Sequence, residues 1–421
     1  MGIQHNICLL NDSFPPLIDG VANVVMNYAD QFTQKGYQTL VVTPSHPQAD
    51  DRQYGYSVLR YPSIDLRKQM GYMAGVPFSP EIGHRLTRDK ASILHSHCPI
   101  MSTLMARELR QLTDAPLVLT YHTKYDVDIE NAIHSKVLQS SSKKALLANI
   151  NACDEVWTVS QGAGENLRLL GYEGEYTVMP NGVDFPRGRV TEAQIEAVTA
   201  DWDFPDGIPV YLFVGRMMWY KGLRIILDAL AALKQRNVPF RMVFIGDGTD
   251  RKAIEQYALK LGVAQWCYFI GSITEREALR AWYCKADLFL FPSTFDTNGL
   301  VVREAAACGL PAVLIRGSAA AEGVRDEVNA FLIDENAESL SSLLASCGRN
   351  RTLLRSIGKT ASMELYISWE VASAKALEQY QIIDEKNKRG FYSKRRSTSE
   401  RFFKMNGELM EGLGNLRHSI K

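Results

Sequence analysis

The sequence has 421 residues, which is enough for two or three domains with ample hydrophobic cores. Its 47 Lys and Arg residues balance 47 Asp and Glu residues, so no overall field favours nucleic acid or an anionic surface. Seven scattered cysteines without a C-x-x-C pair indicate buried thiols in a reducing compartment. No signal pattern is visible, and no run approaches the roughly 20 apolar residues of a membrane span. We therefore expect a cytoplasmic protein, with peripheral contact at the inner membrane face left open.

The first half alternates apolar runs with helical patterns. Helices are expected at stretches such as 21–35 and 103–112. The expected strands are residues 7–10, 39–43, 58–61, 93–96, 117–121, 155–159 and 176–179. Strands that alternate with helices indicate a parallel, doubly wound sheet. We expect a Rossmann-like domain over residues 1–186.

Turn-forming residues interrupt the pattern at 187–208, where they flank a polar helix and give the segment the composition of a linker. The pattern then restarts, with strands expected at 210–215, 241–246, 266–270, 288–291 and 311–315. A second Rossmann-like domain is therefore expected over 209–369, and two such domains would face a central cleft. A periodic helix follows at 370–387, and a basic, partly amphipathic tail at 388–421.

The most informative segment is P-S-T-F-D-T-N-G-L-V-V-R-E, residues 292–304. It follows an expected strand and carries Asp296 and Glu304, eight positions apart, around a loop with Asn298 and Gly299. Ligands bind at this edge of open α/β sheets. Loop amides and the N-terminus of the next helix offer donors to an anion.

Two cations follow the first strand of the second half. F-V-G-R-M-M-W-Y-K-G places Arg216 at the strand's exit and Lys221 five residues later, before a helix. Arg can chelate two phosphate oxygens and Lys adds a point charge, so the pair suits a diphosphate. Gly246, after the next strand, either lets a ligand approach the backbone or forms a tight turn. No dehydrogenase or P-loop glycine motif occurs.

Three segments of the first half follow strands and precede helices or loops. N-D-S-F-P-P-L-I-D-G ends at Gly20, where Asp19 and the prolines could equally cap a helix. T-Y-H-T places His122 at the edge of the sheet. H-S-H at 95–97 has no third ligand at matching spacing, so we expect no metal there.

These segments, together with P-N-G-V-D at 180–184, resemble glycosyltransferase family 4, which comprises retaining nucleotide-sugar enzymes with the GT-B fold. The resemblance covers residues 5–380. The chain has Asp296 and Asn298 where the family usually has Glu and Phe.

The resemblance implies roles for these residues. Glu304 would accept hydrogen bonds from the ribose hydroxyls, and Asp296 would bind hydroxyls of the donor sugar. Amides of Asn298, Gly299 and Leu300 would contact the sugar and β-phosphate, and Arg216 and Lys221 the diphosphate. Gly246 would lie near the base, Gly20 beside the phosphates, and His122 near C6 of the sugar and the reacting carbon. The helix 370–387 would cross back to the first domain.

The first-domain segments further resemble members that glycosylate membrane lipids. The loop 67–78 mixes cations, methionines and aromatics, and the helix 134–144 carries Lys136, Lys143 and Lys144. The run 386–396 is basic and aromatic. These features suit a membrane surface, and a solvated face explains them about as well.

We therefore expect a retaining glycosyltransferase that moves a sugar from a nucleotide-diphosphate donor to an acceptor hydroxyl, such as that of a diacylglycerol-type lipid. The mechanism that the resemblance implies is front-face attack. No aspartate-flanked metal motif stands out, so we expect no metal to be required, and we expect no cofactor and no nucleic-acid partner. Three alternatives stay open at this point: transfer to a polysaccharide or a small molecule, a nucleotide-sugar epimerase, and a non-catalytic nucleotide-sugar-binding protein.

Overall fold

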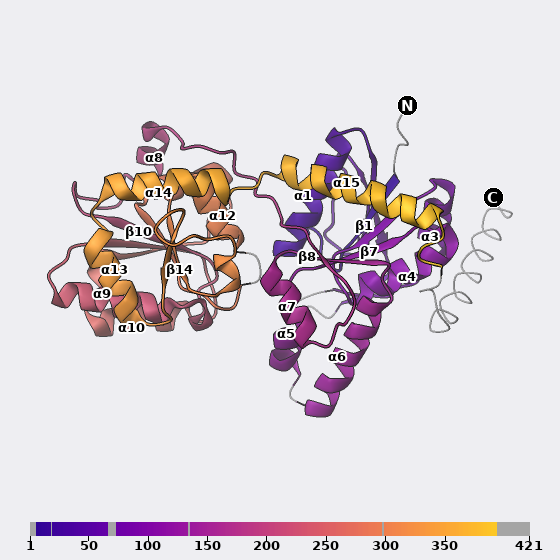
Figure 1. The fold of residues 1–421 in the computed structure, drawn as a ribbon, viewed down its shortest axis with the longest axis horizontal. Coiled ribbons are helices and arrows are strands. Elements are labelled where there is room, and N and C mark those ends of the chain that lie inside the picture. The colour runs from indigo at the N-terminus through magenta and orange to yellow at the C-terminus, as the bar shows by residue number, and fades with distance from the viewer. Residues whose placement is uncertain (1–5, 18, 66–72, 134, 297–298, 394–421) are drawn as a thin grey trace. The chain divides into compact units, whose positions relative to one another are not determined.

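The computed structural model describes residues 6–17, 19–65, 73–133, 135–296 and 299–393. The chain folds into two compact units. The first unit comprises Met1–Asn181 and Trp369–Lys421, and the second unit comprises Gly182–Ser368. Each unit is a Rossmann-like α/β domain built on a parallel sheet (Figure 1), as the sequence predicts.

The first unit contains a seven-stranded parallel sheet in the order β3-β2-β1-β6-β7-β8-β9. Its strands are β1 (Asn6–Leu10), β2 (Gln38–Pro44), β3 (Ser57–Tyr61), β6 (Ile93–Ser96), β7 (Leu117–Tyr121), β8 (Glu155–Thr158) and β9 (Thr177–Val178). Two short strands, β4 (Ser63–Asp65) and β5 (Met73–Gly75), form a separate antiparallel pair. The central strands are buried on both faces, which explains their continuous apolar runs.

The helices of the first unit include one from the far end of the chain. They are α1 (Gly20–Gln34), α3 (Pro80–Arg88), α4 (Met101–Thr113), α5 (Tyr125–Ala132), α6 (Lys136–Asn151), α7 (Gln161–Leu169) and α15 (Trp369–Lys388). The helix α15 lies beside α1 (Figure 1). The ring of Trp369 packs 5.1 Å from that of Tyr28, and Tyr380 packs 5.8 Å from Phe32. The helix α15 is therefore part of the core of the first unit.

The second unit contains a six-stranded parallel sheet in the order β12-β11-β10-β13-β14-β15. Its strands are β10 (Val210–Val214), β11 (Arg241–Ile245), β12 (Cys267–Gly271), β13 (Leu288–Phe291), β14 (Ala312–Ile315) and β15 (Phe331–Ile333). Its helices are α8 (Glu192–Thr199), α9 (Leu223–Gln235), α10 (Arg251–Leu261), α11 (Arg276–Lys285), α12 (Leu300–Ala307), α13 (Ala337–Cys347) and α14 (Arg351–Glu364), with 3₁₀ turns at Trp219–Lys221, Ala264–Trp266 and Ala319–Ala321.

Residues 187–208, which the sequence suggested as a linker, belong to the second unit. They contain α8, whose N-terminus is closed by a capping box between Thr191 and Gln194. The helix packs against α11, and Ile195 is buried in the core of the unit. The chain changes units a few residues earlier than we expected, between Asn181 and Gly182, and returns between Ser368 and Trp369.

Candidate functional site

The strand order of the second sheet reverses between β10 and β13, and the loops that leave these strands carry Lys221 and Asp296. Lys221 Nζ donates to both carboxylate oxygens of Asp296, at 2.8 Å each. Ser293 Oγ donates to Asp296 Oδ2 at 2.8 Å. Ligands of open α/β sheets bind at such a reversal. The fold thus brings together two predicted site residues that are 75 positions apart in the chain.

The surroundings of Lys221 hold its ammonium in place. Lys221 is 7% exposed, and its Nζ lies 5.6 Å from the ring centre of Tyr220 and 5.7 Å from that of Phe295. An ammonium has three N–H donors, and Asp296 accepts from two of them. Asp296 therefore leaves one N–H donor of the ammonium unused.

Arg216 is exposed, and its guanidinium makes no hydrogen bond or ion pair with any other residue that the structure describes. Its loop is nevertheless fixed. Met217 N donates to Asp247 O at 3.0 Å, and Trp219 N donates to the Asp250 carboxylate at 3.0 Å. An exposed guanidinium on a loop whose backbone is fixed by hydrogen bonds is suited to binding a phosphate.

Two glycines let the backbones around this reversal approach closely. Gly222 has φ +79°, and a Cβ there would lie 1.9 Å from Pro292 O. Gly246 has φ +133°, and a Cβ there would lie 2.0 Å from Gly215 O. Contact between backbones therefore accounts for the glycine at 246. Its predicted place near a nucleoside base stays a prediction.

Glu304 lies in α12 and is held by two residues of α11. Arg276 Nη2 donates to Glu304 Oε1 at 2.7 Å, and Tyr283 Oη donates to Glu304 Oε2 at 2.9 Å. The Glu304 side chain is 12% exposed. Burial raises the pKa of this carboxyl above its ordinary value, although Arg276 and Tyr283 oppose the shift. The site thus presents a carboxylate with both oxygens oriented.

The N-terminus of α12 lacks a side-chain cap among the described residues. Gly299 precedes the helix in the left-handed conformation, with φ +56°, and Leu300 is its first residue. Asn298 lies outside the described residues. An uncapped helix start presents amide donors and the positive end of the helix dipole, which together favour an anion.

In the first unit the strand order reverses between β1 and β6. Asp12, which the sequence did not single out, accepts hydrogen bonds from Met101 N at 3.1 Å and Ser102 N at 2.6 Å, so it ties the loop after β1 to α4. Asp19 caps α1, as one of the two interpretations of this loop expected. Gly20 begins that helix, is exposed, and would have nothing within 4 Å of a Cβ. The predicted phosphate contact of Gly20 stays a prediction.

His122 is buried at the end of β7 and belongs to a row of histidines. His97 Nδ1 lies 2.9 Å from His122 Nε2. His95 is hydrogen-bonded to Thr120 Oγ1 at 2.7 Å and to the hydroxyl of Tyr380 in α15. Burial lowers the pKa of all three imidazoles, that of His122 to about 3. His122 is therefore a neutral group, suited to hydrogen bonding rather than to carrying charge.

No group of three or more His, Cys, Asp and Glu side chains within the described ranges is arranged to hold a metal ion. The expectation that no metal takes part stays a prediction. Of the helices in those ranges, none combines the length and the apolar character that crossing a bilayer requires.

The chain matches two family models that together cover most of its length. The model described as "Glycosyltransferase Family 4" matches residues 18–187, and the model described as "Glycosyl transferases group 1" matches residues 194–363. These matches and the two Rossmann-like units define the protein as a glycosyltransferase with the GT-B fold. The chain belongs to glycosyltransferase family 4.

Curated relatives align along most of the chain. The alpha-monoglucosyldiacylglycerol synthase of Acholeplasma laidlawii is 24% identical over 91% of this chain and 98% of its own length. The sulfoquinovosyl transferase SQD2 of Arabidopsis thaliana is 27% identical over 86% of this chain and 71% of its own. Among solved structures, Anabaena HepE in complex with UDP superposes with a TM-score of 0.72 at 18% identity, over 89% of this chain and 99% of its own.

Proposed function

We propose that this enzyme is a retaining glycosyltransferase that moves a sugar from a nucleotide-diphosphate donor to a hydroxyl of a membrane lipid. The observation that carries the donor part is the edge of the second sheet. There, Lys221 and the uncapped start of α12 offer donors to an anion, and Glu304 offers two oriented acceptor oxygens. A nucleoside diphosphate needs both kinds of group, because it joins a ribose diol to two phosphates.

The proposed mechanism is front-face attack. The acceptor oxygen bonds to the anomeric carbon on the side from which the diphosphate leaves, and the proton of the acceptor hydroxyl passes to the departing diphosphate. Negative charge grows on the diphosphate as the glycosidic bond breaks, so cations and amides placed there stabilise the transition state more than the ground state. Arg216 and Lys221 would supply the cations, and the amides of Gly299 and Leu300 would supply hydrogen bonds. Asp296 would hold Lys221 and accept hydrogen bonds from hydroxyls of the sugar.

The first unit would contribute His122 to the sugar. Its neutral imidazole has one ring nitrogen in contact with His97, so its tautomer is tied to that of its neighbour. A neutral group there would hydrogen-bond a hydroxyl without opposing the positive charge that develops at the reacting carbon.

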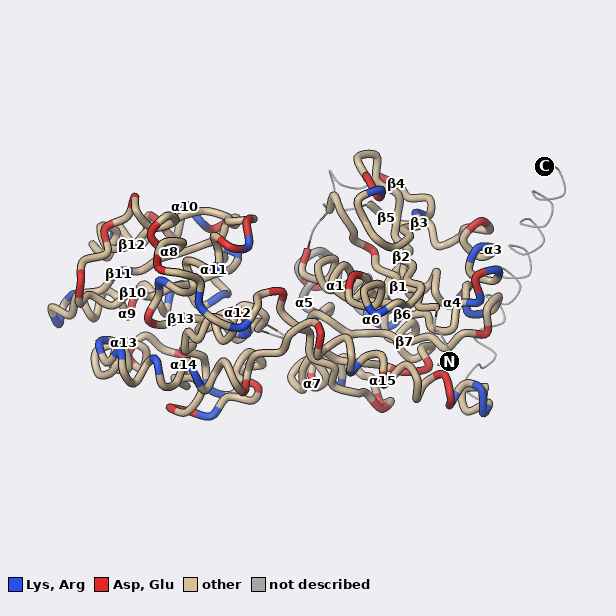
Figure 2. Tube along the Cα trace, turned by 90° about the horizontal axis from the view of Figure 1, so that it is seen from above, with Lys and Arg blue, Asp and Glu red and all other residues tan. Residues whose placement is uncertain are grey.

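Two observations support a lipid acceptor. The relatives named above include a diacylglycerol-lipid synthase and a sulfoquinovosyl transferase. In addition, α6 exposes Val137 (75%) and Leu138 (58%) beside Lys136, and Lys144 follows two turns on. Basic and acidic residues are otherwise interspersed on both units (Figure 2). Exposed apolar side chains beside lysines suit the surface of an anionic bilayer. Half of the loop 67–78 (residues 67–72) and the end of the run 386–396 (residues 394–396) lie outside the described residues.

A thermal-shift screen of nucleotide sugars tests the donor part. A ligand at 100 times its dissociation constant adds about 2.7 kcal/mol of stability, which gives a clear rise in melting temperature. We expect one nucleotide sugar, and its nucleoside diphosphate, to stabilise the wild type and to stabilise Lys221→Ala much less. No response to any nucleotide sugar would contradict the proposal.

Co-sedimentation with vesicles tests the membrane part. We expect binding to phosphatidylglycerol-containing vesicles at low salt and weaker binding at high salt. Lys136→Glu/Lys144→Glu should weaken binding by at least about tenfold, because each lysine near an anionic surface contributes about 1 kcal/mol. The matched control is Lys252→Glu/Lys359→Glu, which reverses two exposed charges of the second unit. If the two double variants weakened binding equally, α6 would not be the element that contacts the membrane.

A further inference from the structure

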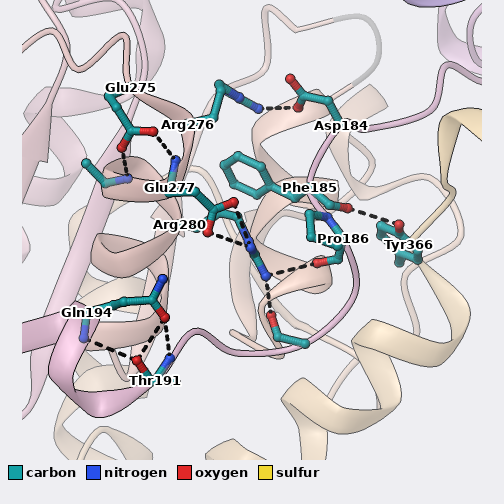
Figure 3. Close-up of polar contacts among 12 residues, drawn as sticks. Asp184, Phe185, Pro186, Thr191, Gln194, Glu275, Arg276, Glu277, Arg280 and Tyr366 are labelled. Carbon is teal, nitrogen blue, oxygen red and sulfur yellow. Dashed lines mark hydrogen bonds and ion pairs between the residues drawn. The ribbon is translucent and has the colours of Figure 1, made fainter.

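The chain segment that enters the second unit is fastened to α11 by two arginines (Figure 3). Arg276 pairs with Asp184, and Arg280 Nη2 donates to Pro186 O at 3.4 Å and to Gly188 O at 3.2 Å. The segment is also held from its other side, because Tyr366 Oη donates to Phe185 O at 3.0 Å. Residues 184–188 therefore have a fixed path over α11.

Arg276 does more than fasten this segment. The same Nη2 that bonds Asp184 also donates to Glu304 Oε1. The guanidinium carbon lies 4.2 Å from the centre of the Phe185 ring. A planar cation that rests on a ring and bridges two carboxylates has little freedom to turn. Its counterpart Arg280, one turn further along α11, pairs instead with Glu277 of the same helix.

Among the described residues, those that hydrogen-bond the carboxylate of Glu304 both belong to α11. Arg276 bonds one oxygen, and Tyr283 bonds the other. A carboxylate offers about four lone-pair directions, so each oxygen can still accept a further hydrogen bond. Two neighbouring acceptor oxygens on one carboxylate are what a vicinal diol requires.

We propose that Arg276 is a positioning residue for recognition of the donor ribose: held by Asp184 and Phe185, it fixes the carboxylate of Glu304 in the orientation that accepts both ribose hydroxyls. The proposal rests on the proposed function, because it takes Glu304 to be the ribose-binding group. It also gives the last residue of P-N-G-V-D, Asp184, a task at the nucleotide site.

The test compares two ligands: the nucleoside diphosphate found by the thermal-shift screen and its 2′,3′-dideoxy analogue. The ratio of their dissociation constants, measured by calorimetry, reports recognition of the diol alone. For the wild type we expect a ratio of about tenfold to a hundredfold, as for hydrogen bonds to a charged group. We expect Glu304→Gln and Arg276→Gln each to bring the ratio below about threefold.

Arg280→Gln is the matched control, because it loosens the same segment from the same helix without touching Glu304. It should keep the wild-type ratio. Melting temperatures of all variants show whether each has folded. If Arg276→Gln does not fold, Arg276→Lys replaces it, since an ammonium keeps the charge but cannot lie flat on Phe185 and bridge both carboxylates. The ratio of dissociation constants for Arg276→Lys should be at least about threefold lower than that of the wild type.

A second readout is the pH dependence of binding. The ionisable groups around Glu304 are Arg276 and Tyr283 of α11, Cys308 directly after α12, and Asp184. Of these, Arg276 is the one cation, so its loss should raise the pKa of Glu304 further. Affinity for the intact ligand should then begin to fall at a higher pH in Arg276→Gln than in the wild type, whereas Arg280→Gln should follow the wild type.

The outcomes distinguish ribose binding by Glu304 from positioning of Glu304 by Arg276. If Glu304→Gln keeps the wild-type ratio, Glu304 does not bind the ribose and that part of the proposed function is wrong. The other informative result is a lower ratio of dissociation constants in Glu304→Gln together with a wild-type ratio and a wild-type pH dependence in the folded Arg276 variant. In that case the positioning role of Arg276 is wrong and the proposed function stands.

Discussion

Lys221 and Asp296 are one functional unit rather than two separate ligands. Both oxygens of Asp296 accept from Lys221, so removing the lysine leaves a partly buried carboxylate beside the proposed diphosphate position. We expect Lys221→Ala to lose at least about tenfold in affinity for the nucleoside diphosphate. The double variant Lys221→Ala/Asp296→Ala should bind at least about threefold better than Lys221→Ala, since the repulsion is gone. Calorimetry measures both, and additive losses would contradict the pairing.

Gly222 provides a test of the close backbone contact at the same place. Gly222→Ala meets both a left-handed conformation and the carbonyl of Pro292, whereas Gly207→Ala has a similar φ of +78° with nothing within 4 Å. The conformational cost alone is about 1–2 kcal/mol. Urea denaturation should therefore show a loss of that size for Gly207→Ala and at least twice as much for Gly222→Ala. Similar losses would mean that the backbone at Pro292 moves aside freely.

The residues that the sequence missed carry no local signal. Arg276 lies in T-E-R-E at the start of a helix, where a charged run is ordinarily a solvated face. Its partners Asp184 and Glu304 are 92 and 28 positions away. Spacing within a motif indicates neighbours along one element, but not which side chains meet across the sheet. The Lys221–Asp296 pair was missed for the same reason, although both residues were predicted to belong to the site.

Among the elements, α15 is the clearest case of a segment that stabilises a distant part of the chain. Tyr380 is fully buried against Phe32 and Trp157, and its hydroxyl bonds His95. Tyr380→Ala should destabilise the protein by about 3–5 kcal/mol, as for other large aromatic truncations. Tyr380→Phe, which removes the partner of a buried ring nitrogen, should cost about 1–3 kcal/mol.

Ile382→Ala on the same helix is the control, because Ile382 is 47% exposed. It should change the free energy of unfolding by less than about 0.5 kcal/mol. Chemical denaturation measures all three variants. If Tyr380→Ala cost no more than Ile382→Ala, the docking of α15 on the first unit would be wrong.

The histidines at the ends of β6 and β7 predict a pH dependence of stability. Their pKa values are depressed in the folded state, so below about pH 6.5 the unfolded chain binds protons that the folded protein does not. Stability should therefore fall as the pH falls. Each such histidine contributes a slope of up to about 1.4 kcal/mol per pH unit. The free energy of unfolding of His122→Gln should thus fall less steeply with pH between pH 6 and 4.5, by about this slope. An unchanged slope would contradict the burial of His122.

Strand prediction succeeded where the strand was a continuous apolar run. Every strand expected in the second half exists, within a residue or two at its ends. β4, β5 and β15 were not expected, because each has only three residues and no run of that length distinguishes a strand from a loop. A polar helix was expected at the position of α8, but as part of a linker, because prolines and glycines surround it and its contacts with α11 are not visible in the chain.

At the scale of the whole molecule, the two sheets share one plan. In each, the strand order reverses beside the first strand in the chain, and the loops at the reversal carry residues predicted for the site. Gly20 and the histidines belong to the first unit, and Lys221, Asp296 and Glu304 to the second. The sequence assigns these residues to the same halves of the chain because its motifs follow particular strands, and their roles at the site stay predictions. The identities of the base, sugar and acceptor depend on side chains that no motif fixes.

The stereochemistry of the product tests the central claim most directly. The wild type would be incubated with the nucleotide sugar selected by the thermal-shift screen and diacylglycerol in anionic vesicles, and the product followed by proton NMR. We predict a glycolipid whose anomeric configuration is that of the donor, formed in step with released nucleoside diphosphate and absent with Glu304→Gln. A product of inverted configuration, or release of nucleoside diphosphate without any glycoside, would contradict the account.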